Sequence, residues 1–368
     1  MKRREFLRRG GSLMAGGMLL GEAQSGEAQS GGAQGGRPDG RVIIDGLGEI
    51  RLEYPMELID EIRDSGLTTC VITVGNPVLQ GTDAFPDLSE EVAAYDTHIR
   101  RHPERFSRVT STADIQRAHV DGTLGLLYYT QNATPLGDDL ARVELLHSIG
   151  VRIVQLTYNH RNLLGDGYLE RTNSGLSTFG IQAVERMNSV GILVDVSHCG
   201  EATTLDAIRF SSRPVAITHA GCSAVFENPR NKSDEVLRAM ARKGGVMGIL
   251  QLNPYLGPRE RNDLNDYLDH IDHAVDVCGI DHVGIGSDRE HQHILDTPEE
   301  VERLRAEIAR LGPEAAARFR WPFFLSELNH PRRMETVAHG LSRRGRPASE
   351  IEKLLGGNFL RLFGETIG

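Results

Sequence analysis

Two histidines and an aspartate follow short apolar segments of the chain. His198 comes just after ILVDV, His219 comes directly after PVAIT, and Asp288 comes just after HVGIG. Neutral imidazoles bind zinc, and a carboxylate orients or deprotonates water. If the apolar segments are parallel strands of one barrel, their ends open at one mouth. We therefore expect a metal site there, with Asp288 as the group that handles protons.

Other polar residues end further apolar segments. They are Asp45, Glu49, Gln131, Asn132, Tyr158, Asn159, His160 and Asp195. Each alone also fits a helix cap or a hydrogen bond, so the joint pattern carries the prediction. Cys199 and Cys222 lie near the histidines in sequence, but a side chain beside a strand-end residue points elsewhere, so we do not expect them as ligands. His291 and His293 are expected in a solvated loop.

Eight apolar segments alternate with amphipathic ones after residue 40. The expected strands are 41–45, 68–73, 124–129, 152–157, 192–196, 214–218, 245–250 and 282–286. The expected helices are 56–65, 90–101, 138–149, 178–190, 202–210, 234–242 and 262–277, followed by 297–310, 325–342 and 348–355 in the tail. The alternation predicts a (β/α)₈ TIM barrel with extra C-terminal helices. A doubly wound open sheet is the alternative, but no glycine-rich nucleotide loop follows the first strand.

The first 40 residues carry no pattern of a folded domain. Arg3 and Arg4 precede Glu5, Phe6 and Leu7, which is typical of a twin-arginine export signal, here over residues 1–25. Its apolar stretch is too short to span a bilayer. Residues 26–40 are a low-complexity linker, and 41–368 form the folded domain. We expect an exported, periplasmic or extracellular protein with no stable membrane anchor.

The composition is that of an ordinary globular protein. The 368 residues are 39% apolar and 25% charged, which excludes collagen-like, coiled-coil and wholly disordered chains. The net charge of −10 argues against nucleic acid as a partner. The four cysteines form no CxxC pair, so a zinc ribbon is excluded.

Six motifs occur in an order that resembles one known family. They are LVDVSH (193–198), AITHA (216–220), PRNKSDE (229–235), GGVMGI (244–249), VGIGSD (283–288) and LGGNFLRLF (355–363). From about residue 41 to the C-terminus they resemble the membrane (renal) dipeptidases, peptidase family M19. The stretch LTYNHRNLLGDG (156–167) is similar to a variant seen in bacterial members.

This resemblance implies a TIM barrel that hydrolyses dipeptides with a two-zinc site. It implies His198 and His219 as ligands of the second metal and Asp288 as the proton-handling aspartate. It also implies that Arg230 meets the substrate carboxylate, with Asn231 as a neighbouring substrate contact. Family members often form homodimers, so a homodimer is compatible with the resemblance.

The chain departs from the family at the first metal. The family's D-G-H-x-D motif reads Asp45-Gly46-Leu47-Gly48-Glu49, so leucine replaces a ligand and glutamate replaces an aspartate. The bridging glutamate is Gln131, and the substrate-contacting histidine is Tyr158. The resemblance therefore implies one zinc ion rather than two, with Gln131 and Glu49 as weaker candidate ligands and Tyr158 as a substrate contact.

Two functions follow from this set of residues. The first is a metal-dependent hydrolase that cleaves dipeptides with a metal-activated water. The second is a catalytically impaired homologue that binds a ligand, or a hydrolase of another small amide. The retained His198, His219, Arg230 and Asp288 favour the first, and the lost ligands favour the second.

Overall fold

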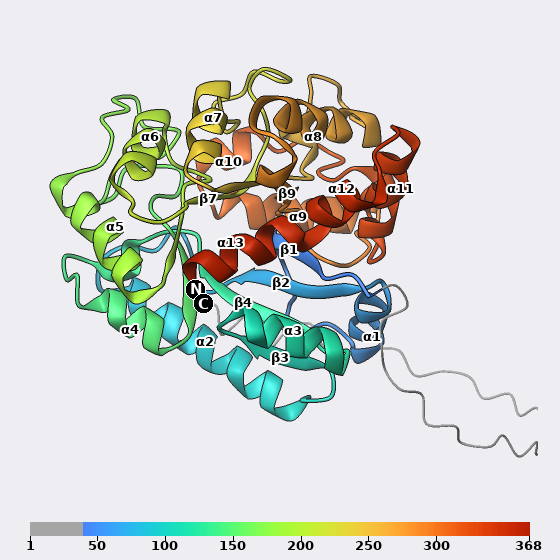
Figure 1. Ribbon diagram of the computed structural model, residues 1–368, viewed down its shortest axis with the longest axis horizontal. Helices are drawn as coiled ribbons and strands as arrows, with labels where there is room; N and C mark the ends of the chain where they lie inside the picture. Colours follow the sequence, from blue (N-terminus) through green and yellow to red (C-terminus); the bar gives the residue numbers. More distant parts are fainter. Residues whose placement is uncertain (1–39) are drawn as a thin grey trace, which may run out of the picture. The chain divides into compact units, whose positions relative to one another are not determined.

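The computed structural model describes residues 40–368, which form a nearly closed parallel barrel (Figure 1). The strands are β1 Ile43–Gly48, β2 Leu67–Thr73, β3 Phe106–Val109, β4 Leu124–Thr130, β5 Val151–Gln155, β6 Leu193–Asp195, β7 Ala216–Ala220, β8 Val246–Ile249 and β9 Val283–Ile285. Eight of them follow the order β1-β2-β4-β5-β6-β7-β8-β9, and every pairing is parallel. The expected barrel is confirmed. The proposed signal peptide, 1–25, and residues 26–39 of the linker lie outside the described residues.

Helices follow the strands and cover the outside of the barrel. They are α1 Met56–Asp64, α2 Ala84–Arg101, α3 Thr112–Asp121, α4 Arg142–Ser148, α5 Thr178–Val190, α6 Glu201–Phe210, α7 Asp234–Arg242, α8 Leu264–Cys278, α9 Pro298–Ala309, α10 Pro313–Ala317, α11 Arg333–Arg343, α12 Ala348–Glu352 and α13 Asn358–Thr366. Local capping explains several boundaries. Ser177 caps α5 through the amide of Gly180, and Gly191 ends the helix with a positive φ of 83°.

The barrel interior is a separate apolar cluster closed at one end by α13. Ile44, Val71, Leu127 and Leu193 point inward from their strands and pack with the rings of Phe359 and Phe363. A Cβ on Gly46 or Gly284 would lie within 2.8 Å of the Phe359 ring, so both glycines are needed for the ring to fit. Figure 1 shows α13 lying across this part of the barrel. The opposite end is therefore the one that remains for a site.

The barrel closes between β1 and β9 just beyond the ends of these strands. The Asp288 amide donates to the Leu47 carbonyl at 2.8 Å, and the Glu49 amide donates to the Arg289 carbonyl at 2.9 Å. Glu49 and Glu290 also form a parallel bridge between the two segments. This closing seam lies directly beside the expected site.

The structure corrects several expected elements. β3 and α3 were not predicted, because the polar pattern FSRV does not read as a buried strand, yet β3 pairs with the first half of β4. The helix expected at 325–342 begins only at Arg333, after Pro331, and is preceded by the 3₁₀ turn Ser326–Leu328. The helix expected at 348–355 changes to a π-helical turn at Lys353, and α13 follows it.

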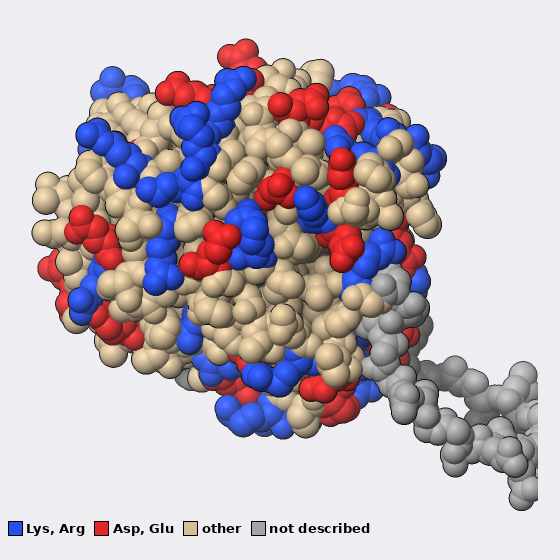
Figure 2. Space-filling model, in the orientation of Figure 1, with Lys and Arg blue, Asp and Glu red and all other residues tan. Residues whose placement is uncertain are grey.

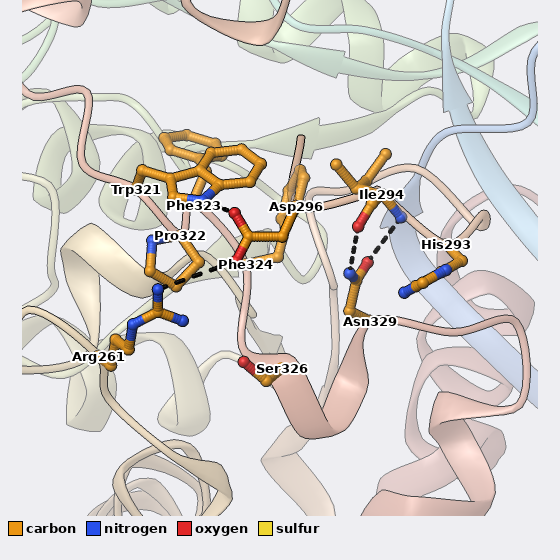
Figure 3. Close-up of a pocket in the computed structure, with 10 residues that line it drawn as sticks. All are labelled: Arg261, His293, Ile294, Asp296, Trp321, Pro322, Phe323, Phe324, Ser326 and Asn329. Atoms are coloured by element: carbon orange, nitrogen blue, oxygen red, sulfur yellow. Dashed lines mark hydrogen bonds and ion pairs between the residues drawn. The ribbon is translucent and has the colours of Figure 1, made fainter. Parts of the chain in front are cut away.

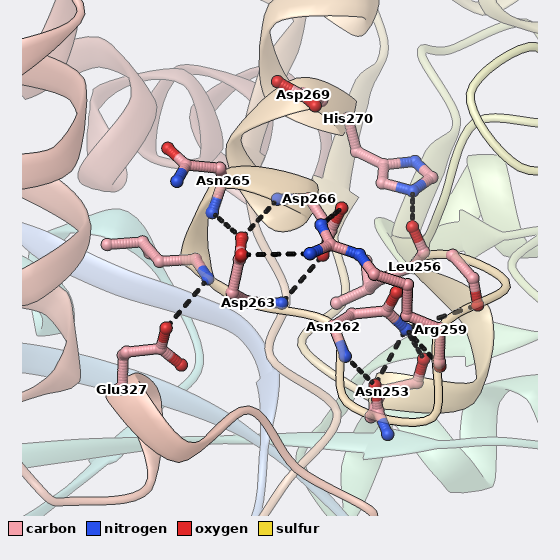
Figure 4. A network of polar contacts seen from close by, with 12 residues as sticks. Asn253, Leu256, Arg259, Asn262, Asp263, Asn265, Asp266, Asp269, His270 and Glu327 are labelled. Carbon is pink, nitrogen blue, oxygen red and sulfur yellow. Dashed lines mark hydrogen bonds and ion pairs between the residues drawn. The ribbon is translucent and has the colours of Figure 1, made fainter.

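The loop between β8 and α8 is held rigidly (Figure 4). Asp263 caps α8 and is bonded reciprocally by Asp266, while the Asn262 side chain donates to both oxygens of Asn253. These bonds anchor the 3₁₀ turn Asn253–Tyr255 near the open end of the barrel. Tyr255, at the end of this turn, is therefore held in a fixed position.

The surface carries charges of both signs. Figure 2 shows lysine and arginine interspersed with aspartate and glutamate on the visible face, without a continuous basic stripe. Among residues 40–368 we find no helix whose length and apolar character would let it cross a bilayer.

Candidate metal-dependent active site

Two imidazoles meet at the open end of the barrel. The Nε2 atoms of His198, after β6, and His219, on β7, lie 3.0 Å apart, and both side chains are buried. Two nitrogen ligands of one tetrahedral zinc ion, with bonds of about 2.0–2.1 Å, stand roughly 3.3 Å apart. The spacing of the two nitrogens is therefore close to that of ligands converging on one ion.

The hydrogen bonds assign the tautomer of His198 and leave two for His219. His198 Nδ1 faces the Asn159 Oδ1 at 2.8 Å, and an amide oxygen only accepts, so the proton is on Nδ1. His219 Nδ1 faces Thr218 Oγ1 at 2.9 Å. The Thr218 hydroxyl has a second neighbour, Ser197 Oγ at 3.1 Å, and Ser197 itself donates to Asp195 at 2.8 Å. When Thr218 donates to Ser197, His219 carries its proton on Nδ1, which is the tautomer that a metal ion on Nε2 requires.

With the proton on Nδ1 of both rings, the two Nε2 lone pairs face each other at 3.0 Å, an arrangement that a shared cation relieves. With the His219 proton on Nε2, the two rings share a hydrogen bond instead. Burial lowers the pKa of both histidines well below the usual value, and the nearby Arg230 lowers it further. Protonation is therefore a poor remedy, and the donor set fits a divalent ion that binds neutral imidazole, such as zinc.

Asp195 organises the segments that carry the two histidines. Its carboxylate accepts the backbone amide of Thr218 at 2.7 Å, the Ser197 hydroxyl at 2.8 Å and the Tyr129 hydroxyl at 2.8 Å. Ser197 and Thr218 directly precede His198 and His219, so one buried carboxylate fixes both strand ends. Such outer contacts hold ligand rings in one orientation. Sequence pattern placed Asp195 at a strand end, but not as this anchor.

Arg230, Asp288 and Tyr158 surround the same mouth. The Tyr158 ring stacks on His198 with centroids 4.4 Å apart. Burial raises the pKa of Asp288 to about 7, while the charge of Arg230 lowers it. Asp288 has a φ of 57°, in the left-handed region that few residues other than glycine adopt and that aspartate tolerates better than most, and residues held there cluster at functional sites. A carboxyl that titrates near neutrality suits proton transfer.

Arg230 is a buried cation without an acidic partner among the described residues. Its guanidinium donates to the carbonyls of Ser197 at 2.6 Å and His219 at 2.7 Å, and no ion pair with a carboxylate accompanies these bonds. These two carbonyls hold the Arg230 guanidinium in place next to the segments that carry the two histidines. A guanidinium held this way is suited to a ligand carboxylate.

The other predicted site residues lie in different surroundings. Burial raises the pKa of Glu49 to about 8, and its charged neighbours are Arg51, Glu91 and Glu290. Gln131 donates from its side chain to Thr73 Oγ1 at 3.0 Å. Asn231 donates to the Phe226 and Tyr255 carbonyls and accepts from the Gly221 amide, so its amide closes the loop. Leu47 packs in the barrel interior, and Asp288 is not within 4.8 Å of both His198 and His219.

The prediction that His291 is solvated is wrong. His291 is 1% exposed, and its Nε2 lies 2.9 Å from Asp45 Oδ2. The chain returns the segment after β9 against β1, a contact that spacing in sequence cannot reveal because the two residues are 246 positions apart. Cys70 on β2 joins them, and the three ligand atoms lie within 4.8 Å of one another. His293, by contrast, is exposed as expected.

Two tyrosines that the sequence did not single out complete the mouth. Tyr168 lies against the His198 ring, with centroids 5.9 Å apart, and Arg318 donates to its hydroxyl at 3.0 Å. Tyr255 is coupled electrostatically to Tyr168, Arg230 and Asp288. The only hint in the sequence was that both follow strands of the barrel. Together with Tyr158 they form an aromatic wall.

A separate pocket of about 250 Å³ lies between the loop after β9 and the segment before α11 (Figure 3). Trp321, Phe323 and Phe324 line it with His293, and the Trp321 Nε1 donates to Asp296 at 2.6 Å. None of His198, His219, Arg230 and Asp288 lines this pocket. It is therefore distinct from the site built on the two histidines.

Comparison with known proteins decides the family. The model of membrane dipeptidases (peptidase family M19) matches residues 58–317, which is more than half of the chain. The chain belongs to peptidase family M19. This is a metal-dependent dipeptidase family, so the paired imidazoles of His198 and His219 stand in a family whose members use metal ions.

Several relatives show how far the family likeness extends. Dipeptidase verJ from Clonostachys rogersoniana is 30% identical over 233 residues, 61% of this chain and 59% of that protein. The chain thus spans about three fifths of the length of that relative. An amidohydrolase from Pseudomonas aeruginosa is 31% identical with a TM-score of 0.78, covering 88% of this chain and 96% of that one.

A more distant solved structure shares the fold. It is a metallopeptidase from Rhodobacter sphaeroides, solved with a phosphinate mimic of the dipeptide L-Ala-D-Ala. The identity is 19%, the TM-score is 0.73, and the match covers 89% of this chain and 100% of that chain. At this identity the similarity supports only the barrel fold of the present chain. The substrate has to be argued from the chemistry of the site.

Proposed function

We propose that this M19 protein hydrolyses the peptide bond of dipeptides with one zinc ion held by His198 and His219. The observation that carries the proposal is the pair of buried imidazole Nε2 atoms 3.0 Å apart at the barrel mouth. When bound, zinc lowers the pKa of water and polarises a scissile carbonyl. A structural relative solved with a dipeptide mimic supports the choice of substrate class.

The remaining chemistry falls to side chains of this chain. Asp288 accepts a proton from the attacking water on its carboxylate and returns it to the leaving amine, because its pKa of about 7 allows both states near neutrality. Arg230 binds the free carboxylate of the dipeptide with its buried fork. Tyr158, stacked on His198, walls the substrate and excludes water from that side.

The test combines metal content with a dipeptide panel that includes D-residues. We expect about one equivalent of zinc at this site, and His219→Ala should lose that metal and turnover together. His293→Ala, an exposed histidine, is the matched control and should keep both. Turnover that persists in metal-free protein, or in His219→Ala, would refute the assignment.

The role proposed for Arg230 has its own readout. A dipeptide and its C-terminal amide differ only in the carboxylate, so the wild type should strongly prefer the free acid. Arg230→Met should reduce kcat/KM for the acid and leave the amide little changed. Equal losses on both substrates would mean that Arg230 only supports the loops through Ser197 and His219.

A second function is favoured by the substitutions at the family's first metal site. Leu47 packs in the barrel interior and offers no donor, and Gln131 is bonded to Thr73. A protein that binds a dipeptide or another small amide without turning it over would retain ligand affinity in calorimetry and yield no product. We further propose that residues 1–25 direct export, which places the enzyme outside the cytoplasm.

A further inference from the structure

A second cluster of ligand atoms lies in the wall of the barrel, at the closing seam beside the mouth. Asp45 is on β1, Cys70 is on β2, and His291 follows β9. Cys70 pairs with Asp45 in the ladder and packs in the outer core, whereas its neighbour Val71 faces the barrel interior. The cluster is therefore on the outer side of the wall, and His198 and His219 are not part of it.

The three ligand atoms converge on one point beside Gly48. A Cβ built on this glycine would lie 2.7 Å from Asp45 Oδ2, 2.9 Å from Cys70 Sγ and 2.9 Å from His291 Nε2. Because Gly48 has no side chain, the three donors can pack against its backbone and face one another, with all three ligand atoms within 4.8 Å of one another.

Hydrogen bonding within the cluster centres on Asp45. Its carboxylate accepts from Ser287 and Arg333, and the ligand atom Nε2 of His291 lies 2.9 Å from it. Cys70 Sγ has a weak contact with its neighbouring carbonyl at 3.6 Å and a backbone contact with Gly48. The thiol is thus the least tightly bonded of the three ligand atoms and gains most from an ion.

We propose that Asp45, Cys70 and His291 bind a divalent metal ion of zinc type as a structural site at the seam where the barrel closes. Cysteine, histidine and aspartate are each zinc ligands, and the three would leave one position of a tetrahedral ion open. On binding, the Cys70 thiol gives up its proton and binds as thiolate, and His291 binds as neutral imidazole. The ion would tie β1 and β2 to the segment after β9, adding to the bridge between Glu49 and Glu290 and the backbone hydrogen bonds at the seam.

Arg333 makes the Cys70 thiolate the main source of negative charge for an ion at this site. Its Nη2 lies 3.3 Å from Asp45 Oδ2 and 3.0 Å from Ser287 Oγ, so the aspartate charge is already shared. The second negative charge needed near a divalent ion must come from Cys70. A metal that binds thiolate well is therefore favoured over magnesium or calcium, which prefer oxygen ligands.

Cobalt substitution tests this site, because a thiolate ligand gives cobalt a charge-transfer absorption that imidazole and carboxylate ligands do not. The full-length protein is stripped with chelator, loaded with cobalt, and assayed for metal by elemental analysis. We expect two equivalents of cobalt in the wild type, one of them with a thiolate absorption band. The His198→Ala/His219→Ala double variant should keep one equivalent of cobalt and the thiolate band. That double variant separates this site from the proposed catalytic ion.

Two variants remove the site in different ways. Cys70→Ala deletes a ligand, and Gly48→Ala keeps all three ligands but fills the point where they converge. Both should lose the thiolate band and one equivalent of cobalt. Cys222→Ala removes another buried thiol, and Gly364→Ala adds a Cβ with no neighbour closer than 3.8 Å. Both of these controls should keep the band.

The wild type alone can overturn the proposal, even if a variant fails to fold. A cobalt-loaded wild type without a thiolate band would mean that the cluster is only a buried polar network around Asp45. A band that persists in folded Cys70→Ala, checked by circular dichroism, would assign the metal to another thiol and equally refute the proposal.

Discussion

Asp288 should reduce the stability of the metal-free fold at neutral and alkaline pH. Burial raises its pKa to about 7 in the folded state, against about 3.9 in an unfolded chain. The folded protein therefore binds a proton that the unfolded chain has lost between these values. The protonated Asp288 side chain therefore costs the fold no stability below about pH 4, and the free energy of unfolding falls as pH rises from about 4 through 7.

The size of the effect follows from the shift. A difference of about three pKa units corresponds to roughly 4 kcal/mol at most. The side chain is only partly buried, so water screens the charge, and we expect about 1–3 kcal/mol. Asp288→Asn keeps the shape and removes the charge. It should raise the free energy of unfolding at pH 8 by that amount and change it little near pH 4.

The assay is denaturant unfolding of chelator-treated protein at both pH values. Asp121→Asn, an exposed carboxylate at the end of α3, is the control and should alter neither value. The same Asp288→Asn variant should lose hydrolysis in the zinc-loaded protein, which would show a group retained for chemistry at a cost in stability. No gain at pH 8, or an equal gain near pH 4, would refute the raised pKa.

Three further predictions concern other parts of the chain. Phe359→Ala opens the apolar end of the barrel and should cost about 3–5 kcal/mol of unfolding free energy, whereas exposed Leu163→Ala should cost little. The Arg161 guanidinium holds the pKa of Asp166 at about 2, so its stabilisation is present above about pH 4 and disappears as pH falls through 2. Arg161→Ala should therefore lower the unfolding free energy by about 1 kcal/mol at pH 7 and have no effect near pH 2, and equal losses at both would contradict this origin. Arg3→Lys with Arg4→Lys should block export in a fractionation assay, and normal export of that variant would argue against the twin-arginine signal.

Much of the barrel could be predicted from local pattern. Strands buried on both faces leave near-continuous apolar runs, and the runs at 124–129 and 246–249 are recognisable without any partner. Helix caps such as Ser177 and Gly191 are equally local, and the helix at 178–190 was predicted with the bounds that the structure has. β3 escaped because half of its residues are only partly buried and its pairing with β4 depends on tertiary placement.

For the site, the sequence determined which residues follow strands, and the structure decided which of them meet. His198 and His219 end neighbouring strands, so a parallel barrel brings them together wherever it forms. The tautomers depend on Ser197, Thr218 and Asp195, whose bonds exist only once the strands are in register. His291 joins Asp45 and Cys70 for the same reason: hydrogen bonds and metal ligation act over a few ångströms of space, whereas sequence patterns record only distances along the chain.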